Sequence, residues 1–71
     1  MRKYTVNKKV GRRIKQVRKE LGLTQEQLAE KVNMHYTTIS RIETGDSNPP
    51  VQTISKIAKA LKVSTGELFD F

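Results

Sequence analysis

The sequence predicts an all-α fold, a compact bundle of five short helices. Apolar residues recur at steps of three and four along several segments, which is the spacing of one helical face. Segments 24–27 and 64–67 have the form of capping boxes, which open helices. No segment alternates apolar and polar residues as a half-buried strand does. With 71 residues, the chain is expected to form one domain.

The first helix is predicted to follow a basic arm at residues 1–6, with Asn7 as a candidate N-cap. Gly22 lies where a helix ends on a left-handed residue. The predicted domain therefore spans residues 7–71. The buried face of its first helix is predicted to consist of Val10, Ile14, Val17 and Leu21.

The second helix is predicted to begin at a capping box, in which the Thr24 hydroxyl accepts from a free amide and Gln27 reaches back. Asn33 tolerates positive φ and can supply a tight turn. A third helix follows at once, and Gly45 ends it. The residues predicted to pack between these helices and the core are Leu28, Ala29, Val32, Met34, Ile39 and Ile42.

The fourth helix is predicted to follow a loop rich in Asp, Ser, Asn and Pro, and Pro50 suits its first turn. Segment 64–67 then opens a short fifth helix that carries Leu68 and Phe69. Two roles are open for Phe69 and Phe71, which could fold back onto the core or form a dimer seam. The buried face of the fourth helix is predicted to consist of Val51, Ile54, Ile57, Ala58 and Leu61.

Positive charge is concentrated at the N-terminal end of the chain. Residues 1–19 hold nine bases and no acid, whereas residues 20–71 hold five bases and seven acids. A phosphate polyanion and an anionic membrane both fit such a patch, and a solvated arm that aids solubility is the third interpretation. Membrane binding is disfavoured, because Arg13, Lys15 and Arg18 leave no wide lipid-facing stripe.

Several kinds of chemistry are excluded by composition. The absence of cysteine removes disulfides and thiolate metal sites, and a single histidine leaves no zinc cluster. The carboxylates are scattered and no nucleophile pairs with a base, so we expect no enzyme, no cofactor and no metal. A chain this short has no room for a sensor domain, so no small-molecule ligand is expected. No apolar stretch has the length of a membrane span or signal region, and we expect a cytoplasmic protein.

Segment 25–44 fits a helix-turn-helix, in which two helices meet at a steep angle across a tight turn. Ala29 is small where the two helices would cross. On a wheel of about 100° per residue, Ile39 and Ile42 fall on one side of the second helix of this pair. The opposite side carries four hydrogen-bonding residues without an acid, which could read base edges in a major groove: Tyr36, Thr37, Ser40 and Arg41.

From about Val10 to Phe69 the chain resembles the phage-repressor-like helix-turn-helix family, the XRE or lambda Cro/cI type. The resemblance implies a lambda-repressor-like DNA-binding domain and a repressor-like transcriptional regulator of double-stranded DNA. It further implies a homodimer on a two-fold-symmetric operator, in a phage, plasmid, restriction-control or antitoxin setting. The motifs that carry it are Ile14-Lys-Gln-Val-Arg18, Leu21-Gly-Leu-Thr-Gln25, Leu28-Ala29, Thr38-Ile-Ser-Arg-Ile-Glu43 with Gly45, Asn48-Pro49 and Ala60-Leu-Lys-Val-Ser64.

The resemblance also implies roles for single residues. Gln25 is expected to bond a backbone phosphate and to buttress the start of the third helix, and Asn48 is expected to contact phosphate. Arg18 and Glu43 match a pair that forms an ion pair between the first and third helices, while a phosphate contact is the alternative for Arg18. The other expected phosphate contacts are Thr24, His35, Lys8, Lys9, Arg12 and Arg13.

The sequence departs from the family pattern at three positions. Asn33 stands where glycine is usual, and His35 stands where a Ser or Thr cap is usual. Asp46 places an acid in a loop that is often basic, which shifts the expected phosphate binding toward the first helix and the arm.

The candidate base-reading residues differ in what they can bond. Arg41 can bond guanine O6 and N7 together, and Thr37 can offer its methyl to thymine. Tyr36 could bond a phosphate, stack against a sugar edge or merely shield the core. The alternative function is a protein-interaction adaptor that docks an acidic partner on its basic arm. The absence of acids at positions 36, 37, 40 and 41 argues against it.

Overall fold

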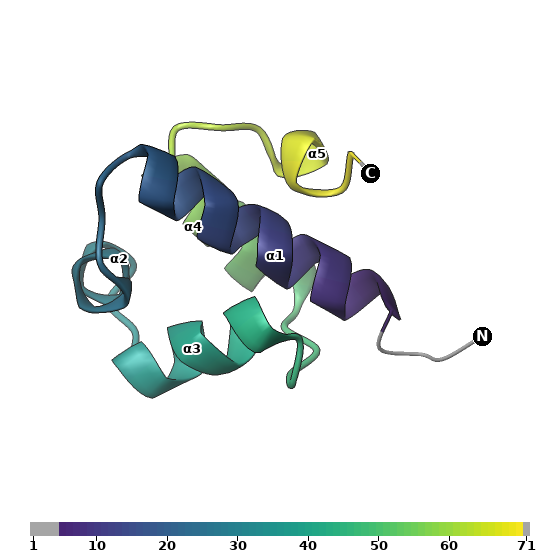
Figure 1. Ribbon diagram of the computed structural model, residues 1–71, viewed down its shortest axis with the longest axis horizontal. Helices are drawn as coiled ribbons and strands as arrows, with labels where there is room; N and C mark the ends of the chain where they lie inside the picture. Colours follow the sequence, from purple (N-terminus) through teal and green to yellow (C-terminus); the bar gives the residue numbers. More distant parts are fainter. Residues whose placement is uncertain (1–4, 71) are drawn as a thin grey trace.

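The computed structural model describes residues 5–70, and Met1–Tyr4 of the predicted arm and Phe71 lie outside this range. Its helices are α1 (Thr5–Glu20), α2 (Gln25–Lys31), α3 (Tyr36–Thr44), α4 (Val51–Ala60) and α5 (Thr65–Leu68). In the view of Figure 1, α1 crosses the middle of the molecule with α3 below it, α5 above it and α4 behind it. No strand occurs within residues 5–70, and the all-α prediction is confirmed.

Both predicted capping boxes are present. Thr24 Oγ1 accepts from the Gln27 amide at 3.0 Å, and Gln27 Oε1 accepts from the Thr24 amide at 2.8 Å. Ser64 Oγ accepts from the Glu67 amide at 3.2 Å, and Glu67 Oε2 accepts from the Ser64 amide at 2.6 Å. These bonds satisfy amides that have no partner inside the helix, and they fix where α2 and α5 begin.

Four helices end on a residue with positive φ. Three of these, Gly22 (73°), Asn33 (56°) and Gly45 (82°), are residues that the sequence marks as helix ends. After each of the four, the next amide donates to the carbonyl five residues back, at 2.9–3.1 Å. The fourth is Lys62 (61°), which the sequence does not predict as a helix end. Lysine is not a typical turn residue, and it adopts the left-handed conformation at some energetic cost.

Among the residues that the structure describes, thirteen hydrophobic side chains form the buried core, and most of them are the predicted ones. The prediction that Leu21 and Val51 are buried is wrong, since they are 47% and 68% exposed. Leu21 follows the last residue of α1 and leaves the helical periodicity, while Leu23 packs against the core. Val51 begins α4 at the rim of the core. The core is Val10, Ile14, Val17, Leu28, Ala29, Val32, Ile39, Ile42, Ile54, Ile57, Ala58, Leu61 and Leu68.

Helix α1 begins at Thr5, three residues before the start that Asn7 as N-cap would give. Asn7 lies inside the helix, so the prediction of Asn7 as N-cap is wrong. The added turn brings Val6 into the lining of an apolar groove of about 190 Å³. The lining of this Phe69 groove is Val6, Asn7, Val10, Ile42, Asn48, Pro49, Val51, Ile54 and Phe69.

Helices α1 and α3 cross in close contact at Gly11, which is buried. A Cβ placed on Gly11 would lie 2.2 Å from the Ile42 carbonyl oxygen and 2.8 Å from that of Glu43. Both are backbone atoms, which cannot move aside as the end of a flexible side chain can. Gly11 therefore sets the distance between α1 and α3.

Replacement of Gly11 by alanine is expected to lower the free energy of unfolding by about 3 kcal/mol or more, because the backbone of α3 must shift. Urea denaturation measures this loss. Gly66→Ala is the matched control, since the Cβ there meets nothing closer than 3.9 Å. Equal stability of the two variants would contradict the close crossing of α1 and α3.

Candidate nucleic-acid interface

Helices α2 and α3 form the predicted helix-turn-helix, and residues 32–35 connect them. Asn33 adopts the left-handed conformation that the turn requires. Ala29 and Leu28 are 3% and 0% exposed, so the second helix of the pair packs closely on the first. Met34 lies in the turn and packs against the core while remaining partly exposed. The predicted span of about 25–44 agrees with these helices.

One side of α3 points away from the core and carries hydrogen-bonding groups. Tyr36 is 52% exposed, Thr37 and Arg41 are exposed, and Ser40 is half-buried. Among residues 5–70, the Arg41 guanidinium has no hydrogen-bond or ion-pair partner. The structure therefore brings these four residues together on one outer surface, called the reading face below.

The N-terminus of α3 has no side-chain cap. His35 occupies the N-cap position with extended backbone (φ −69°, ψ 143°), is exposed, and makes no capping hydrogen bond. The first amides of a helix have no acceptor within the helix, and they carry its positive dipole end. The start of α3 thus lacks a side-chain acceptor at its N-cap, and such helix starts can bind anions.

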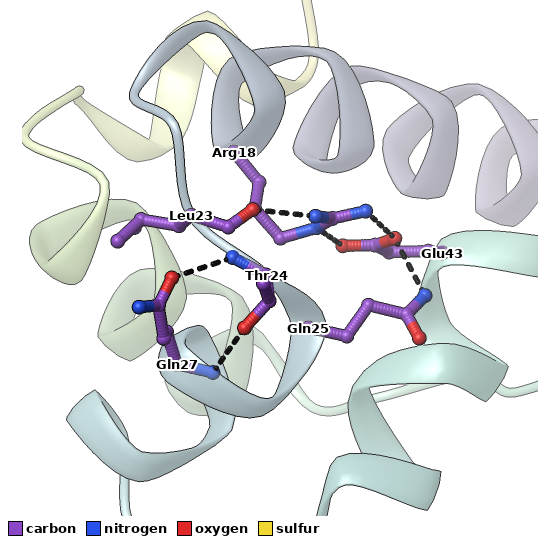
Figure 2. A network of polar contacts seen from close by, with 6 residues as sticks. All are labelled: Arg18, Leu23, Thr24, Gln25, Gln27 and Glu43. Carbon is purple, nitrogen blue, oxygen red and sulfur yellow. Dashed lines mark hydrogen bonds and ion pairs between the residues drawn. The ribbon is translucent and has the colours of Figure 1, made fainter.

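A buried ion pair connects α1 to α3, as predicted, and Figure 2 shows its geometry. Arg18 Nε donates to Glu43 Oε2 at 2.6 Å, and Arg18 Nη2 donates to Glu43 Oε1 at 3.0 Å. Arg18 Nη1 donates to the Leu23 carbonyl oxygen at 2.7 Å. The two residues are 6% and 5% exposed. Because all of these donors are occupied, the structure favours the ion pair over a phosphate contact for Arg18.

Gln25, the first residue of α2, bonds to the same carboxylate. Its Nε2 donates to Glu43 Oε1 at 2.9 Å, as drawn in Figure 2. Glu43 lies near the end of α3, so the prediction that Gln25 buttresses the start of this helix is wrong. The steep crossing of α2 and α3 explains the difference, because it brings the first residue of α2 near the far end of α3. The Glu43 carboxylate of α3 thus accepts hydrogen bonds from side chains of both α1 and α2.

Thr24 lies at the start of α2, and five other candidate phosphate-binding residues lie in two places. Asn48 is exposed in the loop after α3, and the stem of Lys8 lies against Gly45 at the end of α3. Lys9, Arg12 and Arg13 instead line a hollow that faces α5. The structure does not bring these three side chains to the reading face, and their phosphate roles stay predictions.

Residues 14–68 match HTH_3, a helix-turn-helix family. The chain belongs to this family. It is 42% identical over 59 residues to the immunity repressor protein of Bacillus phage phi105, a match that covers 83% of this chain and 41% of the repressor. It is 40% identical over 62 residues to control protein C.BamHI of Bacillus amyloliquefaciens, with 86% of this chain and 76% of that protein covered. The expected resemblance is confirmed.

Solved structures of other helix-turn-helix regulators have the same fold. The restriction-modification controller protein C.AhdI from Aeromonas hydrophila superposes with a TM-score of 0.86 at 33% identity, over 89% of this chain and 96% of that chain. The biofilm regulator SinR, solved in complex with DNA, superposes with a TM-score of 0.81 at 40% identity, over 86% of this chain and 98% of that chain. The helix-turn-helix is a DNA-binding fold.

The family and these relatives are transcription regulators rather than enzymes, which agrees with the prediction for this chain. Between residues 5 and 70, no helix combines the length and the apolar character that crossing a membrane requires. The same range contains no group of three or more His, Cys, Asp or Glu that could hold a metal ion.

A double-mutant cycle tests the buried ion pair. Arg18→Met alone is expected to lower the free energy of unfolding by about 3–5 kcal/mol, because Glu43 then stays buried without its cation. Arg18→Met combined with Glu43→Leu is expected to cost less than the sum of the single changes. Chemical denaturation of the four proteins measures the coupling. Single effects that add to within about 0.5 kcal/mol would show that the two side chains act independently.

Proposed function

We propose that this protein is a sequence-specific, double-stranded-DNA-binding transcriptional regulator of the repressor-like kind, acting in the cytoplasm. The observation that carries the proposal is the reading face, an exposed row of hydrogen-bonding side chains without an acid on the second helix of a helix-turn-helix. A helix with such a face fits the major groove of B-DNA. The related SinR, solved with DNA at 40% identity over nearly the whole of that chain, supports this use of the fold.

Each residue of the reading face has a separate proposed role. Arg41 bonds guanine O6 and N7, because its guanidinium is exposed and has no partner within residues 5–70. Thr37 contacts a thymine methyl, and Ser40 lies beside it at the edge of the contact. Tyr36, next to the uncapped helix start, bonds a phosphate or packs against a sugar.

The proposed phosphate contacts of this duplex surround the reading face. Thr24 and Gln25 lie at the start of α2, and His35 lies at the start of α3. Asn48 and Lys8 lie near the other end of α3. If about eight phosphates are neutralised per dimer, the logarithm of the binding constant falls with the logarithm of salt concentration at a slope near −7.

We further propose that the protein binds as a homodimer through the Phe69 groove. Val6, Val51 and Phe69 are 51%, 68% and 41% exposed around this groove, which makes them an apolar surface without cover in the single chain. Phe69 thus supports the dimer-seam interpretation, whereas Phe71 lies outside the described residues. Two reading faces related by a two-fold axis would contact half-sites roughly 34–36 Å apart.

Selection of random duplex DNA on the purified protein, in competition with bulk DNA, tests the function. The expected result is a consensus with two-fold symmetry that survives the competition. Binding that is salt-sensitive but blind to sequence would overturn the proposal of a specific regulator. In that case only the basic side chains concentrated in residues 1–19 would contact DNA, as in a non-specific complex.

Arg41→Ala and Gln25→Ala are expected to differ in how they change DNA binding. Arg41→Ala should relax specificity at one base position by about 1–3 kcal/mol, since its contact is to a base edge. Gln25→Ala should weaken binding to all sites about equally, since its contact is to phosphate. Binding to operators with single-base changes measures both, with Lys59→Ala as the control for loss of charge. The opposite pattern would show that the two roles are exchanged.

Phe69→Ser is expected to convert the dimer to a monomer and to abolish cooperative binding to the two half-sites. Sedimentation velocity and operator titrations measure these changes. Leu21→Ser is the matched control, because Leu21 is equally apolar and 47% exposed but does not line the Phe69 groove. A dimer that persists in Phe69→Ser, or is lost equally in both variants, would contradict this seam.

A further inference from the structure

A basic surface lies on α1 beside Asp70, the second residue after α5. It is a hollow of about 340 Å³, named the α1–α5 hollow, and its lining is Lys9, Arg12, Arg13, Gln16 and Asp70. Three bases and one acid give it a net positive charge. It uses three of the nine bases that the sequence concentrates in residues 1–19.

The α1–α5 hollow lies on the opposite side of α1 from the reading face. Gly11 touches the backbone of α3, and Lys9 and Arg13 come two residues before and after it. Two residues correspond to about 200° around a helix, so both basic side chains leave α1 on the side away from α3. Figure 1 shows the same arrangement, with α3 on one side of α1 and α5 on the other.

A duplex on the reading face would lie beyond α3, whereas Lys9 and Arg13 leave α1 on the side away from α3. The two shorter dimensions of the domain are 22 and 20 Å between Cα atoms. Charges separated by more than the Debye length of about 8 Å at physiological salt are largely screened from each other. The bases of the α1–α5 hollow are therefore expected to add little to the affinity for DNA bound at α3.

The hollow is organised rather than a loose array of side chains. Arg13 Nε donates to the Glu67 carbonyl oxygen at 3.3 Å, and Arg13 Nη1 donates to Gln16 Oε1 at 3.2 Å. Gln16 Nε2 in turn donates to Glu20 Oε2 at 3.4 Å. Both acceptors of Arg13 are neutral, so these bonds orient the guanidinium without pairing it with a carboxylate. A planar guanidinium held in this way suits a phosphate group.

The composition of the hollow favours nucleic acid over protein as its partner. All five lining residues are polar or charged, and none offers an apolar or aromatic anchor. The centres of protein–protein interfaces are depleted in lysine and acids and are built on such anchors. Protein–nucleic acid interfaces are more polar and much more positive.

From the placement and chemistry of this hollow we infer that it binds the phosphate backbone of a second DNA duplex. One protein molecule then holds two DNA segments, the first at the reading face and the second across α1 and α5. The inference rests on the proposed function, because the first segment is the operator bound through α3.

Capture of a second duplex tests the inference. The duplex obtained by selection is immobilised and saturated with protein, free protein is washed away, and a labelled duplex of random sequence is added. The wild-type protein is expected to retain the label. With three phosphate contacts the salt slope of capture is about −2.7, so a fourfold rise in salt lowers capture about 40-fold.

Matched charge variants identify the surface. Lys9→Gln/Arg12→Gln/Arg13→Gln is expected to lose capture at least about tenfold, whereas Lys56→Gln/Lys59→Gln/Lys62→Gln, which removes the same charge from the α4 region, keeps most of it. Binding to the immobilised operator should fall equally in both triple variants. Lys9→Gln/Arg12→Gln keeps the bonds of Arg13 to Glu67 of α5 and to Gln16 of α1. This double variant is expected to lose capture in part, which separates the effect of charge from any damage to the fold.

Each other outcome decides against the inference. Wild-type protein that binds the operator but retains no label overturns it, and retention of labelled polyglutamate instead points to an acidic protein partner. Equal loss of capture in both triple variants overturns it as well. A larger loss of operator binding in Lys9→Gln/Arg12→Gln/Arg13→Gln than in the α4 variant would mean that the hollow contacts the same duplex as α3, which also overturns the inference. Failure of the wild-type protein to bind any selected operator overturns the proposed function itself.

Discussion

The Glu43 carboxylate is the point on which the arrangement of the three N-terminal helices depends. It lies near the end of α3 and accepts from Arg18 of α1 and from Gln25 of α2. Removing two charges from water costs several kcal/mol per ion, so a pair of this kind contributes little net stability. Its effect is on geometry instead. A displaced α3 would leave a buried carboxylate and a buried guanidinium without partners, and such arrangements are strongly disfavoured.

Gly11 and Arg18 apply this constraint from the same side of α1, because residues seven apart share a helical face. Gly11 admits the α3 backbone to close range, and Arg18 then reaches the Glu43 side chain of the same helix. The core side of α3 is thereby fixed by packing and by charge. Its outer side makes few internal contacts, which leaves the reading face available to another molecule while its position stays defined.

The features that could be predicted from the sequence are those that local chemistry determines. The capping boxes at Thr24 and Ser64 and the turns at Gly22 and Asn33 depend on a few neighbouring residues, and the structure has them all. Periodicity alone does not say where a buried face ends, and Leu21 and Val51, which it predicts in the core, are exposed. The pairing of Arg18 with Glu43, 25 residues apart, came from the family resemblance. The close approach at Gly11 and the bond from Gln25 to Glu43 depend on how helices cross, which no local pattern specifies.

If the protein binds DNA as proposed, the small size of the reading face gives a physical reason for a second copy. Arg41 is the only formal charge among its four residues, and each wrong base pair in a site costs about 1–3 kcal/mol. One face can therefore distinguish only a few base pairs, against a large number of competing sites. Joining two copies adds their discrimination energies, since the second half-site is bound at high effective concentration. In the proposed dimer, the Phe69 groove would therefore determine sequence choice as strongly as the residues of α3, although no base contact is proposed for it.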